Sequence, residues 1–181
     1  WPILSTITFL PLLGAAFILL IRGDEATIAR NSRHVALWTT LVTFALSLVL
    51  IFSFDTTTAA FQFEEYTPWL PEYGIGYHLG VDGISVFFLL LTTFLVPICI
   101  ISCWDSVKTR VREYMLAFLI LETLMVGVFS SLDMLMFYIF FEGQLIPMFL
   151  IIGIWGGARR VYSAYKFFLY TLVGSVLFLL A

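Results

Sequence analysis

The stretch FYIFFEGQLIPMF, Phe137–Phe149, holds one carboxylate and one proline inside an apolar segment. The carboxylate belongs to Glu142, and Pro147 follows five residues later. Apolar residues continue on both sides, from 134 to 154. A helix rises about 1.5 Å per residue, so this segment is long enough to cross a bilayer. The stretch therefore predicts a transmembrane helix with an ionisable group near its centre.

The composition of the whole chain is that of an integral membrane protein. Of its 181 residues, 61% are hydrophobic and 12% are charged, whereas a soluble domain carries about 25% charged residues. The net charge of -3 gives no reason to expect nucleic-acid binding, so lipid is the expected surrounding. The cysteines, Cys99 and Cys103, lie in an apolar run and are too few for a zinc site, which usually takes about four ligands. We therefore expect no metal site.

Six segments are long and apolar enough to span a membrane. Their expected boundaries are 2–21, 35–54, 84–103, 113–130, 134–154 and 161–181. The predicted fold class is all-α, a polytopic transmembrane helix bundle that forms a single domain over residues 1–181. The last segment has no polar flank, so we expect the sequence to be a fragment truncated in the sixth helix.

Lysine and arginine gather in alternate loops between these spans. The first, third and fifth loops hold Arg22, Arg30, Arg33, Lys108, Arg110, Arg112, Arg159 and Arg160. The long loop 55–83 and the short fourth loop hold neither residue type. By the positive-inside rule the cation-bearing loops face the cytoplasm or its equivalent, with the N-terminus and loop 55–83 on the other side. Loop 55–83 is rich in aromatic residues, which predicts a short hairpin or an interfacial helix rather than a disordered segment.

Three ionisable groups lie inside the expected spans: Glu122 in the fourth, Glu142 in the fifth and Lys166 in the sixth. Such groups usually face a bundle interior or water and mark an ion pathway. Glu142 lies roughly 18 Å from the cation-bearing side, and Glu122 roughly 14 Å. Both are near mid-membrane on adjacent helices. We predict that they lie within reach of a bridging water and exchange protons near neutral pH.

A structural interpretation stays open for each of these groups. A protonated glutamate can hold helices together, and a lysine can extend to the membrane interface. Lys166 is only roughly 8 Å into its span, so it is either an interface residue or a cation that pairs with a glutamate. Pro147 cannot donate a backbone hydrogen bond to the carbonyl of Gly143, which predicts a helix kink beside Glu142. The carboxylate, the glycine and the kink together predict a hydrated spot within the membrane.

Three segments resemble a known family. They are FYIFFEGQLIPMFLIIGIWGG, the run HLGVDGISVFFLLLTTFLVP (His78–Pro97) and the final YKFFLYTLVGSVLFLLA. They are similar to the antiporter-like membrane chains of proton-pumping NADH:quinone oxidoreductase, respiratory complex I. The similarity is greatest to the N-terminal part of chain M, and it covers most of the sequence. The motifs VDGIS and FEGQLIPM carry it most specifically.

The resemblance implies a fold of about fourteen helices with inverted repeats, of which this sequence holds the first helices. It implies that Glu142 is the central carboxylate of a proton pathway, that Glu122 is a second acidic position, and that Lys166 belongs to a motif of less defined role. It also implies a proton-translocating subunit of an oxidoreductase, driven by quinone reduction elsewhere in the complex.

The same resemblance implies no cofactor in this chain, with FMN, iron–sulfur clusters and quinone in other subunits. The implied partners are the other membrane subunits and lipid. The implied location is the bacterial inner membrane or the mitochondrial inner membrane, with the N-terminus on the periplasmic or intermembrane side.

Two other functions stay open on the sequence alone. One is a chain of a multisubunit cation/proton antiporter or of a membrane-bound hydrogenase, because these share the glutamate of the fifth helix. The other is a membrane scaffold that transports nothing, in which Glu142 is a protonated structural residue. No nucleophile–base pair or ligand cluster in the sequence supports an active site of the chain's own.

Overall fold

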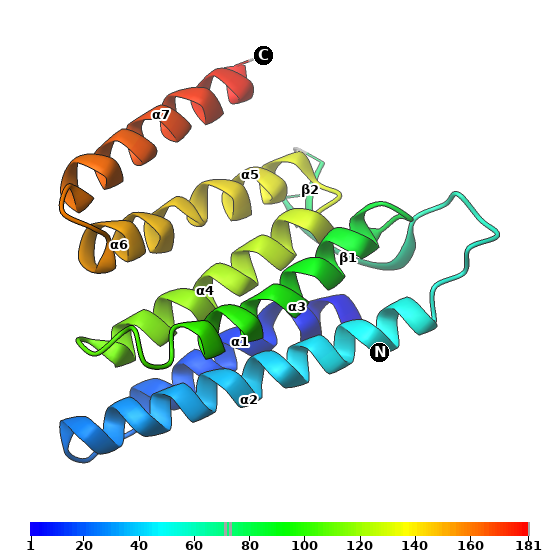
Figure 1. Ribbon diagram of the computed structural model, residues 1–181. Coiled ribbons are helices and arrows are strands. Elements are labelled where there is room, and N and C mark those ends of the chain that lie inside the picture. Colours follow the sequence, from blue (N-terminus) through cyan, green and yellow to red (C-terminus); the bar gives the residue numbers. More distant parts are fainter. Residues whose placement is uncertain (71, 73, 181) are drawn as a thin grey trace.

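The computed structural model describes residues 1–70, 72 and 74–180. In chain order its elements are α1 (Ile3–Leu20), α2 (Glu25–Phe52), β1 (Gln62–Leu70), β2 (Ile75–Val81), α3 (Ser85–Ser102), α4 (Val111–Ser130), α5 (Met134–Gly143), α6 (Leu145–Trp155) and α7 (Arg160–Leu180) (Figure 1). Taking α5 and α6 as one segment, the described residues contain six helical segments long and apolar enough to cross a membrane. The predicted class, a polytopic transmembrane helix bundle, is confirmed.

The second helix starts earlier than the sequence predicts. It begins at Glu25 instead of at residue 35, and the expected start was therefore wrong. Asp24 caps it, because its Oδ2 atom accepts a hydrogen bond of 3.3 Å from the backbone N–H of Thr27. The hydropathy-based prediction left these first turns out of the span because they are polar, although they are helical. Arg30 and Arg33 consequently lie on a helix and not in a loop.

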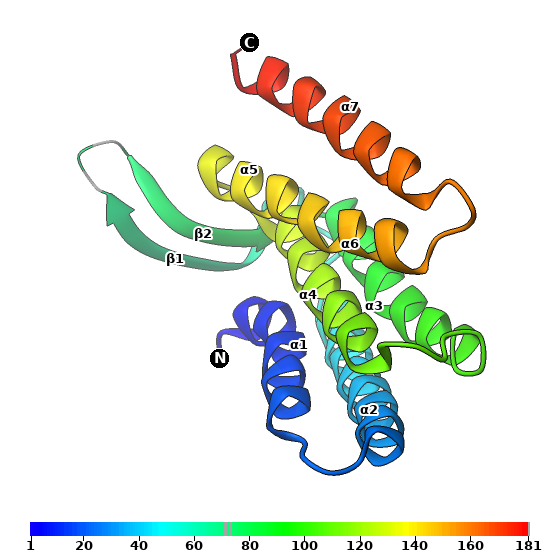
Figure 2. The ribbon, with the colours of Figure 1, turned by 90° about the vertical axis from the view of Figure 1, so that its left-hand side faces the viewer.

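Helices α1 to α4 pack into a bundle, and the later helices lie on one side of it. Helix α4 also contacts α5 and α6, while α7 packs on α6 and has fewer contacts with α5. Figures 1 and 2 show α7 diverging from α5 toward the C-terminal end of the chain. Close approach of α1 to α2 needs Gly14, because a Cβ atom there would lie 2.5 Å from the hydroxyl of Thr39. The core of the bundle is therefore the space between α1, α2, α3 and α4.

The long loop folds as an antiparallel β1–β2 hairpin at one end of the bundle (Figure 2). Its Glu65 carboxylate accepts hydrogen bonds from the backbone N–H groups of Leu4, at 2.8 Å, and Ser5, at 3.1 Å. It also accepts from the Ser5 hydroxyl, whose oxygen lies 2.7 Å from that of Tyr77. Pro2, at the start of α1, offers no side-chain cap. Glu65 thus supplies from the hairpin the acceptor that this helix start lacks.

The hairpin is also bonded to the turn between α4 and α5. The backbone N–H of Leu132 donates to the carbonyl of His78 at 2.9 Å. Asp133 caps α5 by accepting from the N–H of Leu135 at 2.9 Å, and its other oxygen accepts from the N–H of Gly76 at 3.3 Å. The hairpin therefore links the ends of α1, α4 and α5, and β2 leads into α3.

The junction between β2 and α3 is held by Asp82. Its carboxylate accepts a 2.7 Å hydrogen bond from the backbone N–H of Ser85, and this bond holds the pKa of Asp82 below its usual value. A lowered aspartate pKa stabilises the fold above the ordinary value of about 3.9. That contribution is lost as the pH falls through the lowered pKa.

We expect Glu65→Ala to loosen the hairpin and lower the thermal stability of the protein. The change leaves two backbone N–H groups and the Ser5 hydroxyl without their acceptor, at a cost of about 1–3 kcal/mol. Thermal unfolding in detergent, followed by tryptophan fluorescence, measures the effect. Glu64→Ala is the matched control, because the Glu64 side chain is half exposed and, within the described residues, its one polar partner is His78. Equal melting temperatures for the two variants would contradict the role of Glu65.

Candidate functional site

The fifth span is broken beside its carboxylate. Helix α5 ends at Gly143 and α6 begins at Leu145, so Gln144 separates them. Pro147, in the first turn of α6, has no N–H to donate to the carbonyl of Gly143, and its ring crowds that carbonyl. The sequence predicts one kinked helix over 134–154, whereas the structure has two helices with a break between them. The break lies one residue after Glu142 and its neighbour Gly143.

Glu142 is held by a serine from the last helix. The hydroxyl of Ser175 donates a 2.7 Å hydrogen bond to Oε2 of Glu142 and thereby joins α7 to α5. Ser175 is buried. The other carboxylate oxygen, Oε1, is also buried and has no hydrogen-bond partner within the described part of the chain. Sequence reasoning missed Ser175, because a serine in an apolar span usually binds its own helix and no fixed spacing relates it to Glu142.

The Glu142–Ser175 pair can accommodate two protonation states. Ser175 has one hydroxyl proton and two acceptors within reach, the Glu142 carboxylate and the backbone carbonyl of Leu172 at 2.9 Å. With Glu142 ionised, that proton bonds to the carboxylate. With Glu142 neutral, the acid can donate to the serine oxygen while Ser175 donates to Leu172. The heavy atoms can keep their places while a proton arrives or leaves.

A cleft of about 410 Å³ lies between α5 and α7 next to this pair. It is lined by Phe137, Phe141, Tyr170, Thr171, Gly174, Ser175 and Phe178. Ser175 belongs both to the cleft wall and to the hydrogen bond with Glu142. Most of the wall is aromatic or otherwise apolar, so the carboxylate lies behind a low-polarity surface. The hydroxyl of Ser175 therefore connects the cleft to the partly buried carboxyl group of Glu142.

Close packing fixes α5 and the break against α4. A Cβ atom at Gly127 would lie 2.5 Å from the ring of Phe140, so the ring occupies the space that the glycine leaves. Near the break, a Cβ atom at Gly143 would lie 3.1 Å from the side chain of Leu124. The face of α4 that carries Leu124 and Gly127 is therefore the face that contacts the fifth span.

Glu122 lies on another face of the same helix. It shares that face with Leu119 and Val126, which belong to the apolar core of the α1–α4 bundle. Its side chain is fully buried, and neither carboxylate oxygen has a hydrogen-bond partner among the residues that the structure describes. The prediction of a water bridge between Glu122 and Glu142 does not fit this arrangement, since Glu122 shares the α4 face that lies in the bundle core, whereas Glu142, on α5, is hydrogen-bonded to Ser175 of α7.

Lys166 is not brought to Glu142 either. It lies on α7 nine residues before Ser175, which is roughly 14 Å along the helix. Its side chain is exposed, and its Nζ atom lies 5.9 Å from the centre of the Tyr162 ring. No ion pair with a carboxylate occurs for Lys166 among residues 1–70, 72 and 74–180. Both roles left open by the sequence, an interface residue or the partner of a glutamate, stay predictions.

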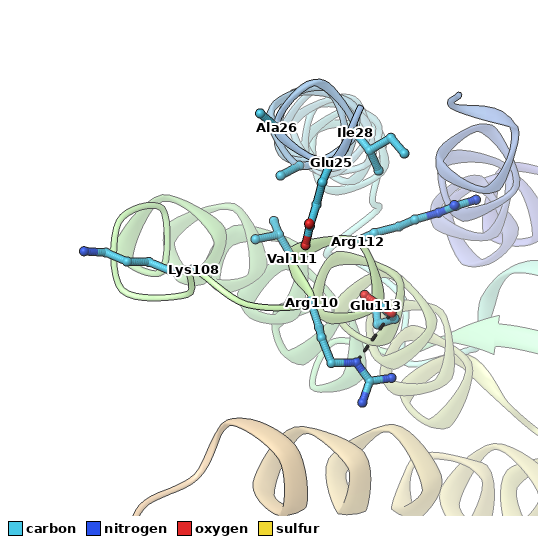
Figure 3. Close-up of a pocket in the computed structure, with 9 residues that line it drawn as sticks. Glu25, Ala26, Ile28, Lys108, Arg110, Val111, Arg112 and Glu113 are labelled. Carbon is cyan, nitrogen blue, oxygen red and sulfur yellow. Dashed lines mark ion pairs between the residues drawn. The ribbon is translucent and has the colours of Figure 1, made fainter. Parts of the chain in front are cut away.

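Another hollow, of about 650 Å³, lies at the opposite end from the hairpin. It is lined by Glu25, Ala26, Ile28, Ala29, Lys108, Arg110, Val111, Arg112 and Glu113 (Figure 3). Arg110 pairs with Glu113 at 3.5 Å, and Arg112 donates to the carbonyl of Leu19 at 2.5 Å. Lys108 points away from both arginines in Figure 3. The cationic side chains point in different directions and do not converge on one point in the hollow, so it has no set of charges arranged to bind one ligand.

Comparison with protein families identifies the chain. The model described as NADH-ubiquinone oxidoreductase chain 4, amino terminus, matches residues 26–130, which is more than half of the sequence. The chain belongs to this chain 4 family. A second model, described as NADH:quinone oxidoreductase/Mrp antiporter, TM, matches residues 131–181, the part that contains Glu142 and Ser175. The resemblance seen in the sequence motifs is thereby confirmed.

Individual relatives of this chain 4 sequence agree. NADH-quinone oxidoreductase subunit M of Rhodobacter capsulatus is 56% identical over 99% of the chain, and the match covers 35% of that protein. NADH-ubiquinone oxidoreductase chain 4 of Marchantia polymorpha is 50% identical over 98% of the chain, and 36% of that protein is covered. The chain thus spans about a third of the length of the curated relatives it matches.

Solved structures share the arrangement of the helices. A chain of respiratory complex I from Thermus thermophilus with bound NADH has a TM-score of 0.76 and 31% identity, with 95% of this chain and 33% of that chain covered. A chain of the membrane-bound sulfane sulfur reductase, an archaeal respiratory membrane complex, has a TM-score of 0.73 at 17% identity, covering 99% of this chain and 36% of that one. The second likeness shows a common fold only.

Proposed function

We propose that the chain is the N-terminal part of a proton-translocating membrane subunit of NADH:quinone oxidoreductase. The observation that carries the proposal is Glu142, a carboxylate placed at a break in mid-span, bonded to Ser175 and adjoining a cleft. The names of the chain 4 and subunit M relatives support it. Quinone reduction elsewhere in the complex drives the movement of protons. FMN, iron–sulfur clusters and quinone belong to other subunits, and this chain binds the neighbouring membrane subunits and lipid.

In this proposal Glu142 alternately holds and releases a proton. The break at Gln144 leaves backbone carbonyls that water can satisfy, which gives protons a route through otherwise apolar surroundings. A nearby cation stabilises the carboxylate, and its withdrawal favours uptake of a proton. Because Lys166 lies far along α7, we place this cation on the remaining two thirds of the full-length chain. A change in conformation that moves the cation then drives the proton onward.

The orientation of the chain follows from its charges. The cations lie at the end of the bundle away from the hairpin, and the positive-inside rule places that end on the cytoplasmic or matrix side. The hairpin and the N-terminus then face the periplasm or the intermembrane space. The membrane is the bacterial inner membrane or the mitochondrial inner membrane.

The second candidate function is a chain of a multisubunit cation/proton antiporter or of a membrane-bound hydrogenase. The family description that names Mrp antiporters, over residues 131–181, favours the former. Activity measurements on the complex that is purified with the full-length chain distinguish these functions. We expect NADH:quinone activity that acidifies one side of sealed vesicles. Proton exchange that depends on an added cation and not on NADH would favour the antiporter, and hydrogen evolution would favour the hydrogenase. A scaffold without transport predicts normal pumping for Glu142→Gln.

We expect Pro147→Ala to slow proton translocation without removing any charge. Alanine restores the N–H that the carbonyl of Gly143 lacks, so α5 and α6 tend to join and Glu142 turns away from Ser175. The initial rate of NADH-driven proton uptake should fall by up to roughly tenfold, or about 1.4 kcal/mol in the barrier. Pro68→Ala, in the hairpin, is the control and should pump normally. An unchanged rate for Pro147→Ala in assembled complex would show that the break is not needed.

A further inference from the structure

The buried core of the α1–α4 bundle consists of two apolar clusters. One lies toward the hairpin and includes Ile7, Leu50, Leu89 and Val126. The other lies toward the cation-rich end and includes Ala15, Ala36, Val96, Ile100 and Leu119. Each of the four helices contributes to both clusters. The residues between the two clusters therefore form a layer across the middle of the bundle.

The buried residues of this middle layer are mostly polar. On α2 they are Thr40, Thr43 and Ser47, on α3 Thr92 and Thr93, and on α4 Leu121, Glu122 and Thr123. On α1 they are Thr8, Pro11 and Gly14. One hydrogen bond crosses the layer directly, with 2.7 Å between the hydroxyl oxygens of Ser47 and Thr93. A layer of hydroxyl groups thus interrupts the apolar core near mid-membrane.

Most of these hydroxyl groups donate their proton to their own helix. Thr8, Thr40, Thr43, Thr92 and Thr93 each donate to a backbone carbonyl three or four residues earlier. A hydroxyl whose proton is used in this way still offers lone pairs to other groups. Thr123 is the exception, because its buried hydroxyl has no hydrogen-bond partner in the described part of the chain. The layer as a whole therefore presents more acceptors than donors to a group placed among its hydroxyl groups.

Glu122 is the acid in this layer. Its carboxyl group is fully buried between Leu119 and Val126, and both oxygens lack hydrogen-bond partners within residues 1–70, 72 and 74–180. An ionised carboxylate accepts only and needs donors, whereas a neutral acid donates and is suited to acceptors. The described residues place no other carboxyl, amine or imidazole group between the two clusters. Nothing charged in the layer would stabilise an ionised Glu122.

We propose that Glu122 is a second proton-binding site, set in the hydroxyl layer of the α1–α4 bundle and separated by α4 from Glu142. The ligand is the proton itself, which needs no cavity. The site does not depend on the function proposed for Glu142, since Glu122 lies in the core of the α1–α4 bundle whereas Glu142, on α5, is hydrogen-bonded to Ser175 of α7. It holds its proton while Glu142 exchanges protons with the cleft.

Infrared spectroscopy of the assembled complex in membranes tests this proposal. A neutral carboxyl group gives a C=O band that shifts in heavy water, and an ionised carboxylate does not give this band. We expect the band in the wild-type protein at neutral pH and its loss in Glu122→Gln. The control Glu113→Gln removes an exposed, paired carboxylate of the same helix and should keep the band. A band of unchanged size in Glu122→Gln would overturn the proposal.

Two further measurements keep the test decisive. If Glu122→Gln fails to assemble, wild-type protein with isotope-labelled glutamate replaces it. A neutral glutamate carboxyl that persists at alkaline pH supports the site, and full ionisation of all labelled glutamates at neutral pH overturns it. The variant Glu142→Gln tells the two proposals apart. Normal pumping in that variant would contradict the function proposed for Glu142, whereas the infrared band of Glu122 would still support the proton site at Glu122.

Discussion

Replacing Glu142 with alanine should abolish NADH-driven proton translocation by the assembled complex, with a loss of at least roughly a hundredfold, or about 2.7 kcal/mol. Glu142 is the acid bonded to Ser175 beside the cleft, and alanine can neither hold a proton nor accept the serine's hydrogen bond. Proton uptake by sealed membrane vesicles is the measurement, with assembly checked on a native gel. Glu142→Asp should retain part of the rate, because it keeps the carboxyl group on a shorter side chain.

Two variants show whether the loss belongs to this carboxyl group. Glu113→Ala removes an exposed acid at the cation-rich end of α4 and should pump normally. Ser175→Ala keeps the acid but removes its donor, so we expect a smaller loss than for Glu142→Ala. Normal pumping by assembled Glu142→Ala would mean that the acid is structural and would favour the scaffold function. A loss of equal size in Glu113→Ala would point to a general defect.

Substituting Gly127 with leucine should prevent assembly of the chain into its complex. The Cβ atom alone would lie 2.5 Å from the ring of Phe140, which is buried between α4 and α5. Overpacking typically costs about 1–3 kcal/mol, and leucine adds three further carbon atoms. The ring has little room to move, so α5 must leave α4 and carry Glu142 with it. The fraction of chain recovered in assembled complex on a native gel measures the effect.

Alanine variants separate crowding from helix propensity. Alanine favours a helix over glycine by about 1 kcal/mol. Gly174→Ala should therefore not destabilise the protein, because among the described residues no atom outside the local helix backbone lies within 4 Å of the added carbon. Gly127→Ala should destabilise it despite the same gain in propensity. Adding Phe140→Leu to Gly127→Ala should restore stability. Equal stability of Gly127→Ala and Gly174→Ala would show that Phe140 yields easily and that the contact is not critical.

Hydropathy predicted the membrane-spanning parts well and their polar extensions poorly. Five of the six expected spans match helical segments to within about two residues, because about 20 apolar residues in lipid have few alternatives to a helix. The early start of α2 depends on Asp24, a capping residue that a hydropathy window does not weigh. The hairpin was one of two options for loop 55–83, and its position depends on Glu65 reaching α1 across 61 residues of sequence.

The candidate site was predicted only in part for a similar reason. Depth and composition single out Glu142, and the proline after it explains the neighbouring break. The donor to Glu142, Ser175, lies 33 residues away, and no local pattern relates the two. The direction of Glu122 depends on which face of α4 meets α5, and that choice is made by the contact of Gly127 with Phe140. The depth of a residue in its span does not predict its partner or the direction of its side chain. Contacts between the helices determine both.

The broken fifth span is anchored at both of its far ends. At one end Asp133 binds the hairpin, and at the other the indole N–H of Trp155 donates to the carbonyl of Thr109 at 2.9 Å while its ring packs against Tyr114. Because both outer ends are held and the helix is interrupted at Gln144, the two helices can change their angle only by a sideways movement of the interruption. Any motion of the span is therefore concentrated at Gln144. It displaces Glu142 laterally, parallel to the membrane plane, toward or away from α7. The loops at either surface can stay still while the acid changes its surroundings.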